Sequence, residues 1–150
     1  MEEPGRHLKP QQCSSICNTM FVPLRILLVE DHHDTRQTIA RLLFRRGFHI
    51  HEEETCRGAE EAVERMEFDV LISDISLPDG DGYRLVRRIL EKRPSLVAIA
   101  QSGYCSGQDL QRCREAGFLH HLCKPYTIDS LEAVVNQAVS RTRGRLHEAP

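Results

Sequence analysis

The segment Asp69–Asp74, with the sequence DVLISD, carries the main signal for the fold. It is a short apolar run that ends abruptly in a carboxylate. A run that is apolar on both faces is typical of a strand in the interior of a parallel sheet. The segment Arg25–Val29 (RILLV) has the same character and is followed directly by Glu30 and Asp31. We therefore expect two buried strands, each with acidic side chains at its carboxyl end.

Three more strand segments alternate with five helical segments along the chain. The other strands are expected over Phe48–His51, Leu96–Ala100 and Phe118–Cys123. A stripe of apolar residues at helical spacing follows each strand, and the five stripes include Leu43, Val63, Leu85, Cys113 and Val135. Regular alternation of strands and helices indicates right-handed crossovers. It predicts a doubly wound α/β fold, with a parallel sheet covered by helices on both faces.

Length and charge limit the possible classes. The chain has 150 residues and a formal net charge of -2, which favours one domain and argues against a general nucleic-acid binder. No apolar run is long enough for a membrane helix, and the N-terminus does not resemble a secretion signal. We expect a disordered leader over 1–23, a folded domain over 24–140 and a polar tail over 141–150.

The cysteines are expected to be free thiols. Without an export signal the chain is assigned to the cytoplasm, where reducing conditions disfavour disulfides. Cys13 and Cys17 are the only close pair. A zinc site would need a second pair of ligands, for which His32 and His33 are weak candidates. Cys105 receives no role beyond a position near the mouth of the site.

Charged and hydroxyl side chains follow the ends of the predicted strands, namely Glu30, Asp31, Asp74, Ser102 and Lys124. Ligands of open parallel sheets bind outside the carboxyl ends of the strands. Two carboxylates about 4 Å apart repel by about 4 kcal/mol at an effective dielectric constant of 20, so a counter-charge is expected. Mg²⁺ takes carboxylates together with waters and phosphate oxygens, and Lys124 can neutralise further charge. The alternative is that these acids merely cap the following helices.

With these residues in place, the chain resembles the receiver domains of two-component response regulators, the CheY-like superfamily. The motifs that carry the resemblance are Val29-Glu30-Asp31, Asp74–Gly82, Ser102-Gly103 and Lys124-Pro125. They occur in the family's order and spacing, and the resemblance covers 25–140. It implies a flavodoxin-like (βα)5 fold with strand order 2-1-3-4-5. Ser102–Tyr104, Ala116–Phe118 and His121–Pro125 are more similar to receivers of hybrid histidine kinases than to those of transcription factors.

The resemblance implies an acidic centre that accepts a phosphoryl group. Asp74 matches the phosphoacceptor. Glu30 and Asp31 match the acidic pair that holds Mg²⁺ together with Asp74, and the backbone carbonyl of Ser76 matches a further metal ligand. Phosphoryl transfer depends on positioning and charge neutralisation more than on covalent help, which fits such a set.

The resemblance also assigns residues that bind the phosphoryl group and respond to it. Ser102 and Lys124 match the hydroxyl and the ammonium that contact it, and Pro125 matches a proline that follows a cis peptide bond. His121 stands where the family commonly has Tyr or Phe as the switch residue, so an imidazole replaces the aromatic ring that swings inward. Ser76 and Tyr104 occupy the positions that tune the lifetime of the phosphorylated state.

The function implied is that of a phosphoacceptor receiver in a phosphorelay. Asp74 would accept a phosphoryl group from a phosphohistidine donor, and the domain would then change conformation, dock a protein partner and lose the phosphate slowly. The expected partners are a histidine kinase or a histidine phosphotransfer protein and an unidentified target. The docking surface is expected around the fourth helix, the fifth strand and the fifth helix. No DNA-binding domain, no membrane contact and no catalysis beyond its own phosphorylation and dephosphorylation are expected.

Two other readings of the same fold stay open. One is a receiver that never carries phosphate and only docks a partner, and the other is a receiver fragment of a hybrid histidine kinase. Other classes fit less well. A dinucleotide fold lacks its Gly-rich turn after the first strand. A phosphatase of the haloacid dehalogenase type would need an acid at Ser76, and Asp79–Gly82 does not align with a calcium loop.

Overall fold

The structure is a computed structural model that describes the backbone of residues 23–147 and the side chains of residues 23–140. The predicted leader, apart from residue 23, lies outside the described residues. Cys13 and Cys17 lie there too.

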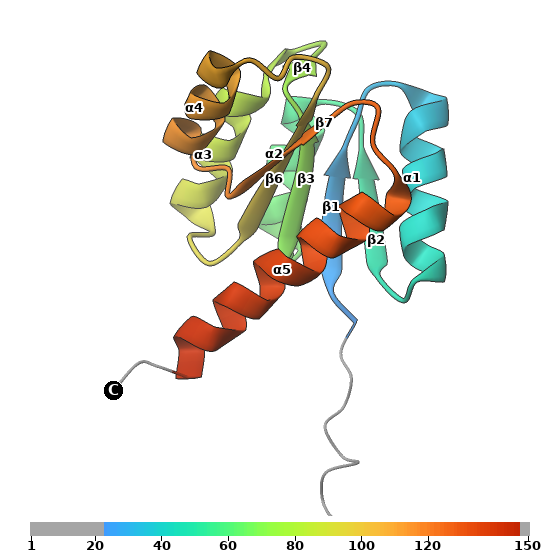
Figure 1. The fold of residues 1–150 in the computed structure, drawn as a ribbon, viewed down its shortest axis with the longest axis vertical. Coiled ribbons are helices and arrows are strands. Elements are labelled where there is room, and N and C mark those ends of the chain that lie inside the picture. The colour runs from blue at the N-terminus through green and yellow to red at the C-terminus, as the bar shows by residue number, and fades with distance from the viewer. Residues whose placement is uncertain (1–22, 148–150) are drawn as a thin grey trace, which may run out of the picture.

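Five parallel strands form one sheet, and their order confirms the prediction. The sheet runs β2-β1-β3-β6-β7, which is 2-1-3-4-5 when only its own strands are counted (Figure 1). The strands are β1 (Arg25–Val29), β2 (His49–Glu53), β3 (Val70–Asp74), β6 (Val97–Ser102) and β7 (His120–Cys123). Every neighbouring pair is parallel. All carboxyl ends of the strands therefore lie along one edge.

Five helices cover both faces of the sheet. They are α1 (His33–Arg45), α2 (Cys56–Arg65), α3 (Gly82–Lys92), α4 (Gly107–Ala116) and α5 (Ile128–His147). The helices α1 and α5 pack on one face, while α2, α3 and α4 pack on the other. This is the doubly wound α/β arrangement expected from the alternating pattern.

The apolar run of β1 forms an interior strand because the side chains on both of its faces are buried. In β1, Leu27 and Val29 belong to the core beneath α2 and α3. Ile26 and Leu28 belong to the core beneath α1 and α5. All four side chains are fully buried, which satisfies the period of two with apolar residues at every position. The edge strand β2 instead consists only of exposed and half-buried residues.

Two features differ from the sequence-based expectation. The segment after β3 is not only a break, because β4 (Ser76–Leu77) and β5 (Gly80–Asp81) form a small antiparallel hairpin. The helix α5 also continues past residue 140, where the tail was placed, to His147. Residues 141–147 contain no proline and are rich in arginine, a good helix former, which favours continuation of the helix.

The expectation of free thiols is wrong for one pair of cysteines. Cys105 and Cys123 form a disulfide with a Cα–Cα distance of 6.0 Å. Cys56 and Cys113 are buried free thiols. The pair comes together because the loop after β6 folds back over the neighbouring strand β7, a contact that residues 18 positions apart do not reveal in the sequence.

None of the helices in residues 23–147 combines the length and hydropathy needed to span a bilayer.

Gly82 provides a test of how tightly the backbone packs beside Asp74. A Cβ atom at Gly82 would lie 2.4 Å from the Asp74 carbonyl oxygen, whereas a Cβ at Gly107 would contact nothing within 4 Å. Both glycines are the first residue of a helix. We predict that Gly82→Ala lowers the free energy of unfolding by about 1–3 kcal/mol through overpacking. Urea denaturation should show no decrease in the free energy of unfolding for Gly107→Ala. Equal decreases in the two variants would contradict the prediction.

Candidate functional site

The candidate site lies at the carboxyl edge of the sheet. Glu30 and Asp31 follow β1, and Asp74 is the last residue of β3. One ligand oxygen from each of these three residues lies within 4.8 Å of the others. Parallel pairing of β1 with β3 brings them together, as the sequence analysis expected. Such a set of carboxylates is the kind of ligand that Mg²⁺ prefers.

Lys124 joins two of the acids. Its Nζ donates to Glu30 Oε2 at 2.8 Å and to Asp74 Oδ2 at 3.0 Å. The Glu30 side chain is 2% exposed and the Asp74 side chain 13% exposed. The peptide bond from Lys124 to Pro125 is cis, which is the geometry that the resemblance implied. An ammonium between two poorly hydrated carboxylates offsets the repulsion that they would otherwise exert on each other.

Glu30 is held by further donors that the sequence analysis missed. Its Oε1 accepts from the His32 backbone N–H at 3.2 Å, and its Oε2 accepts from Gln101 Nε2 at 3.2 Å. The Tyr126 hydroxyl donates to the Gln101 side-chain oxygen. Gln101 is fully buried. A polar residue inside an otherwise apolar strand was the signal that could have found it.

Burial and charge act in opposite directions on the ionisable groups of the site. Burial raises the pKa of Glu30 above its usual range, although Lys124 and the His32 N–H act to lower it. Burial also opposes the charge of Lys124, but the hydrogen bonds and negative charges of Glu30 and Asp74 outweigh it and raise the pKa of the ammonium. Lys124 is therefore protonated at neutral pH, and the two carboxylates stabilise its positive charge.

Asp31 and Ser76 lie at the open side of the site. Both residues are exposed, and Asp31 contributes an oxygen to the acidic group. The backbone N–H of Ser76 donates to Asp74 Oδ1 at 3.3 Å. The Asp74 carboxylate is thus fixed by one contact on each oxygen, from Ser76 and from Lys124. The role of the Ser76 carbonyl as a metal ligand stays a prediction.

Ser102 is the buried last residue of β6. Its Oγ accepts from the Tyr104 backbone N–H at 3.0 Å, and its carbonyl accepts from the Lys124 N–H at 2.8 Å. Ser102 is therefore tied both to the loop that follows it and to the residue carrying the ammonium. The Tyr104 side chain itself is 74% exposed, so in this structure its ring does not pack over the site.

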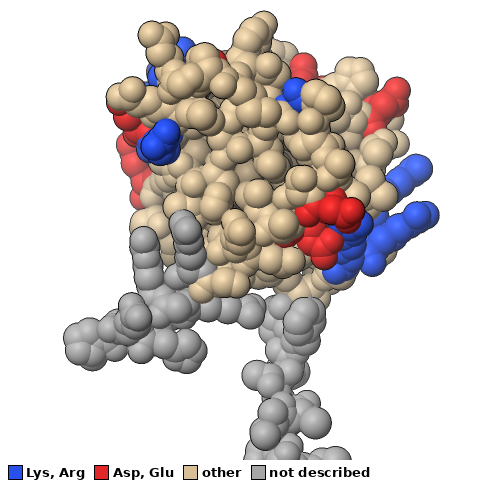
Figure 2. Space-filling view, viewed as in Figure 1, with Lys and Arg blue, Asp and Glu red and all other residues tan. Residues whose placement is uncertain are grey.

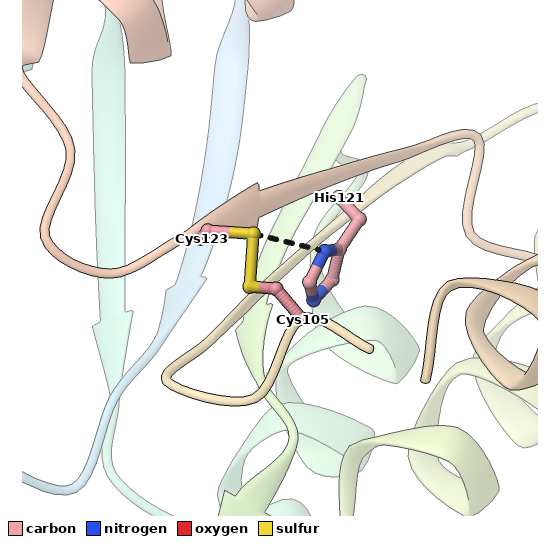
Figure 3. A group of neighbouring side chains, drawn as sticks. All are labelled: Cys105, His121 and Cys123. Atoms are coloured by element: carbon pink, nitrogen blue, oxygen red, sulfur yellow. Dashed lines mark hydrogen bonds between the residues drawn. A yellow bond between two sulfur atoms is a disulfide. The ribbon is translucent and has the colours of Figure 1, made fainter. Parts of the chain in front are cut away.

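His121, the residue at the expected switch position, lies beside the disulfide (Figure 3). The ring is half-buried, and its Nδ1 lies 3.8 Å from Cys123 Sγ. Burial lowers the pKa of His121, partly opposed by Asp109. The ring is thus neutral near pH 7 and contacts sulfur rather than the acidic group.

Two acids of the long motif after Asp74 serve the backbone. Asp79 accepts from the N–H groups of Cys56 and Arg57 at 2.8 and 3.0 Å, at the start of α2. Asp81 is the N-cap of α3 and accepts from the Arg84 N–H. Helix capping therefore explains these two acids. It does not explain Glu30 and Asp74, which pair with Lys124.

Comparison with known proteins identifies the class. The model of the response regulator receiver domain matches residues 26–136. A CheY-like receiver domain protein from Methanospirillum hungatei superposes with a TM-score of 0.79 at 22% identity, covering 83% of this chain and 99% of that one. The HemR receiver domain from Leptospira biflexa gives a TM-score of 0.73 at 27% identity, covering 79% and 95%. The chain belongs to the response regulator receiver domain family of two-component signalling.

Two of the curated relatives are proteins that the match covers only in part. The sensor histidine kinase RcsC of Salmonella typhi is 31% identical over 129 residues, which cover 80% of this chain and 13% of that protein. The transcriptional regulatory protein PdtaR of Mycobacterium tuberculosis is 34% identical over 126 residues, covering 81% and 60%. The chain therefore spans only part of the length of these relatives, and the similarity to a histidine kinase receiver agrees with the sequence analysis.

The Lys124 ion pairs should contribute measurably to stability. We predict that Lys124→Met lowers the free energy of unfolding by about 1–3 kcal/mol, because Glu30 is then left buried with one charged donor fewer. Lys92→Met removes a comparable ion pair with Glu64 at the surface and should cost less than about 0.5 kcal/mol. Chemical denaturation without divalent cations makes the comparison. Equal costs would show that the site pair is no more than a surface contact.

Proposed function

We propose that this protein is a phosphoacceptor receiver in which Asp74 takes a phosphoryl group from a phosphohistidine donor. The single observation that carries the proposal is the placement of Lys124 Nζ between the Glu30 and Asp74 carboxylates. One ammonium, one acceptor carboxylate and adjacent acids are what acyl phosphate formation requires. The family membership agrees with this chemistry.

The acidic residues fit a divalent cation. Glu30, Asp31 and Asp74 offer three oxygens within 4.8 Å, and the Ser76 carbonyl is the proposed additional ligand. Mg²⁺ bound there would supply positive charge for the phosphoryl oxygens. Two mainly buried carboxylates share a single ammonium, so the group retains negative charge that a cation can offset.

The transfer itself uses the Asp74 carboxylate as nucleophile. One Asp74 oxygen attacks phosphorus, an O–P bond forms, and the P–N bond to the donor histidine breaks with its electron pair returning to the imidazole. Ser76 N–H and Lys124 orient the carboxylate for this attack. In-line positioning of this kind supplies much of the acceleration in phosphoryl transfer.

Ser102 and Lys124 then bind the phosphoryl group. The Ser102 Oγ already accepts from the Tyr104 N–H, so its own proton can be donated to a phosphoryl oxygen. Lys124 would move from Glu30 and Asp74 toward the new negative charge. Because Ser102 and Lys124 end adjacent strands, their movement would shift the β6–α4 loop, which is the proposed conformational switch.

Hydrolysis by water would return Asp74 to the carboxylate, and we expect this step to be slow. Ser76 and Tyr104 are the proposed lifetime-tuning residues. Since the Tyr104 ring is exposed in this structure, shielding would require the ring to close over the phosphoryl group. His121 is the proposed switch-position residue. The protein would catalyse no reaction beyond its own phosphorylation and dephosphorylation.

The proposed partners follow from this chemistry. A histidine kinase or a histidine phosphotransfer protein would donate or receive the phosphoryl group in the cytoplasm. The output would be docking of a target protein on α4, β7 and α5, including Arg112, Arg114 and His120. Figure 2, seen from the α5 side, shows charged side chains mainly toward the margins and few near the centre, which suits a protein contact. Whether the domain acts alone or within a longer kinase chain is left open by the proposal.

Phosphorylation of Asp74 is directly testable. With Mg²⁺ and a small acyl phosphate, the protein should gain one phosphoryl mass that is acid-stable and base-labile, and Asp74→Asn should abolish the gain. Asp69→Asn, at the opposite end of the same strand region, should leave it intact. No gain in the native protein would favour the alternative of a receiver that only docks a partner.

Binding of Mg²⁺ should depend on the exposed acid of the group. We expect titration calorimetry to show millimolar or tighter Mg²⁺ binding that Asp31→Asn weakens at least about tenfold, equal to about 1.4 kcal/mol. Asp34→Asn, an exposed acid in the first turn of α1, is the matched control and should change affinity little. Equal affinities in all three proteins would remove these carboxylates as ligands.

A further inference from the structure

A disulfide joins the β6–α4 loop to the end of β7, and the proposed function makes no use of it. Cys105 lies in the loop and Cys123 is the last residue of β7. Figure 3 shows the bond crossing between these two segments, with the His121 ring beside it. Both cysteines are exposed. A thiolate from solution can therefore reach the bond.

The bond lies next to the two residues that the proposed function assigns to the phosphoryl group, Ser102 and Lys124. Cys123 pairs with Ser102 across the two strands and immediately precedes Lys124. Cys105 Sγ lies 3.7 Å from the Ser102 carbonyl oxygen. Tyr104, the residue before Cys105, donates its backbone N–H to Ser102 Oγ. A covalent link here restrains Ser102 and Lys124 together.

The disulfide also closes a ring of chain that contains two elements of the proposed docking surface. The chain from Cys105 to Cys123 includes all of α4 and β7. Gly107, the first residue of α4, is two positions from Cys105, so the N-terminal end of this helix cannot separate from β7 while the bond is intact. Closing a ring of this size removes alternative conformations of the enclosed segment.

We propose that Cys105 and Cys123 form a reversible redox site that controls the receiver: the disulfide restrains the β6–α4 loop and α4 and opposes phosphorylation of Asp74, and the dithiol releases them. This inference rests on the proposed function. The described arrangement has Ser102 bonded to its own loop and Lys124 paired with two carboxylates. A phosphoryl group must draw Lys124 away from Glu30 and bring Ser102 and Lys124 toward Asp74, which is the movement that the bond resists.

The exchange can be written with a dithiol reductant. A thiolate of the reductant attacks one sulfur, and the second thiol of the reductant then resolves the mixed disulfide. The Cys105–Cys123 bond breaks, one S–S bond forms in the reductant, and two electrons and two protons pass to the two cysteines. The His121 Nδ1, 3.8 Å from Cys123 Sγ, is placed to exchange a proton with that sulfur.

The remaining described cysteines are poorly suited to the same reaction. Burial, together with the nearby Asp79, raises the pKa of Cys56 to about 12, and burial raises the pKa of Cys113. A thiol that rarely ionises is a weak nucleophile. A disulfide in a reducing compartment is usually transient and redox-sensing, so an exposed one beside the working residues fits a control element better than a structural staple.

Metal binding is a competing use of the same side chains. Ligand atoms of Cys105, His121 and Cys123 lie within 4.8 Å of one another, and two thiolates with an imidazole are ligands that Zn²⁺ accepts. Both sulfurs are consumed in the disulfide, which is the state that the structure shows. We therefore argue for redox control and treat zinc binding as an outcome of the test.

The test compares phosphorylation of the oxidised and reduced protein. The full chain carrying Cys13→Ser and Cys17→Ser is prepared in both states, with the Cys105–Cys123 bond verified by peptide mass spectrometry. We expect the reduced form to be phosphorylated by a small acyl phosphate and Mg²⁺ at least about fivefold faster, the lower end of common couplings between sites. Adding Cys105→Ser and Cys123→Ser should give the fast rate under both conditions.

Several outcomes decide the matter. Equal rates in the two verified redox states would overturn the inference while leaving the proposed function intact. Absence of phosphorylation in both states would overturn the proposed function, and the inference with it. Stoichiometric Zn²⁺ retained by the reduced protein, with no redox dependence once zinc is chelated, would assign the three side chains to a metal instead. Circular dichroism, with Cys105→Ala and Cys123→Ala as a second pair, checks that the variants fold.

Thermodynamic linkage between the redox site and the phosphoryl site allows a second, independent measurement of their coupling. If the disulfide weakens the binding of a phosphoryl mimic by some factor, the mimic must favour the dithiol by that same factor. Beryllium fluoride with Mg²⁺ should therefore shift the thiol–disulfide equilibrium, measured against a dithiothreitol buffer, at least about fivefold toward the dithiol. Asp74→Asn should show no shift. A mimic that binds the native protein without moving this equilibrium would contradict the proposed coupling.

Discussion

Mutual repulsion among carboxylates at one edge of the sheet is the constraint on which the site depends. Parallel pairing brings the ends of β1 and β3 together, so Glu30 and Asp74 cannot avoid each other. Lys124, delivered from the end of β7, relieves that repulsion by binding both. The ion pairs thus connect strands that lie on opposite sides of β6 in the sheet. Any charge added to or removed from this group changes the electrostatic interactions of Lys124, which directly follows β7.

Much of the fold could be predicted because burial on both faces leaves a direct trace in the sequence. Runs such as Val70–Ile72 are typical of interior strands, and the acids that come after such runs mark where the strands end. The order of the strands needed the family resemblance, since periodicity states which segments are strands and not which are neighbours. The hairpin over 76–81 and the last turns of α5 were missed because two-residue strands and a helix end rich in arginine carry no periodic apolar signal.

The placement of a side chain at the acidic edge could be predicted where it follows from a position at a strand end. Glu30, Asp31, Asp74 and Lys124 are of this kind. Contacts that depend on tertiary packing were not found. Gln101 reaches Glu30 from within an apolar strand, and Tyr126 reaches Gln101 from beyond Pro125. The disulfide was missed for another reason. The redox state of a cellular compartment predicts the state of most cysteines in it, but it takes no account of two cysteines that the folding of a loop brings together.

The hydrogen bond from Tyr126 to Gln101 has a spectroscopic consequence. The chain contains three tyrosines and no tryptophan, so tyrosine emission is not lost to an indole acceptor. Tyr126 is linked through a single amide to the Glu30 carboxylate, and burial raises the pKa of Tyr126 to about 12. Tyr104 by contrast lies in water. Intrinsic tyrosine fluorescence would therefore contain a built-in reporter of events at the acidic edge, without any attached dye.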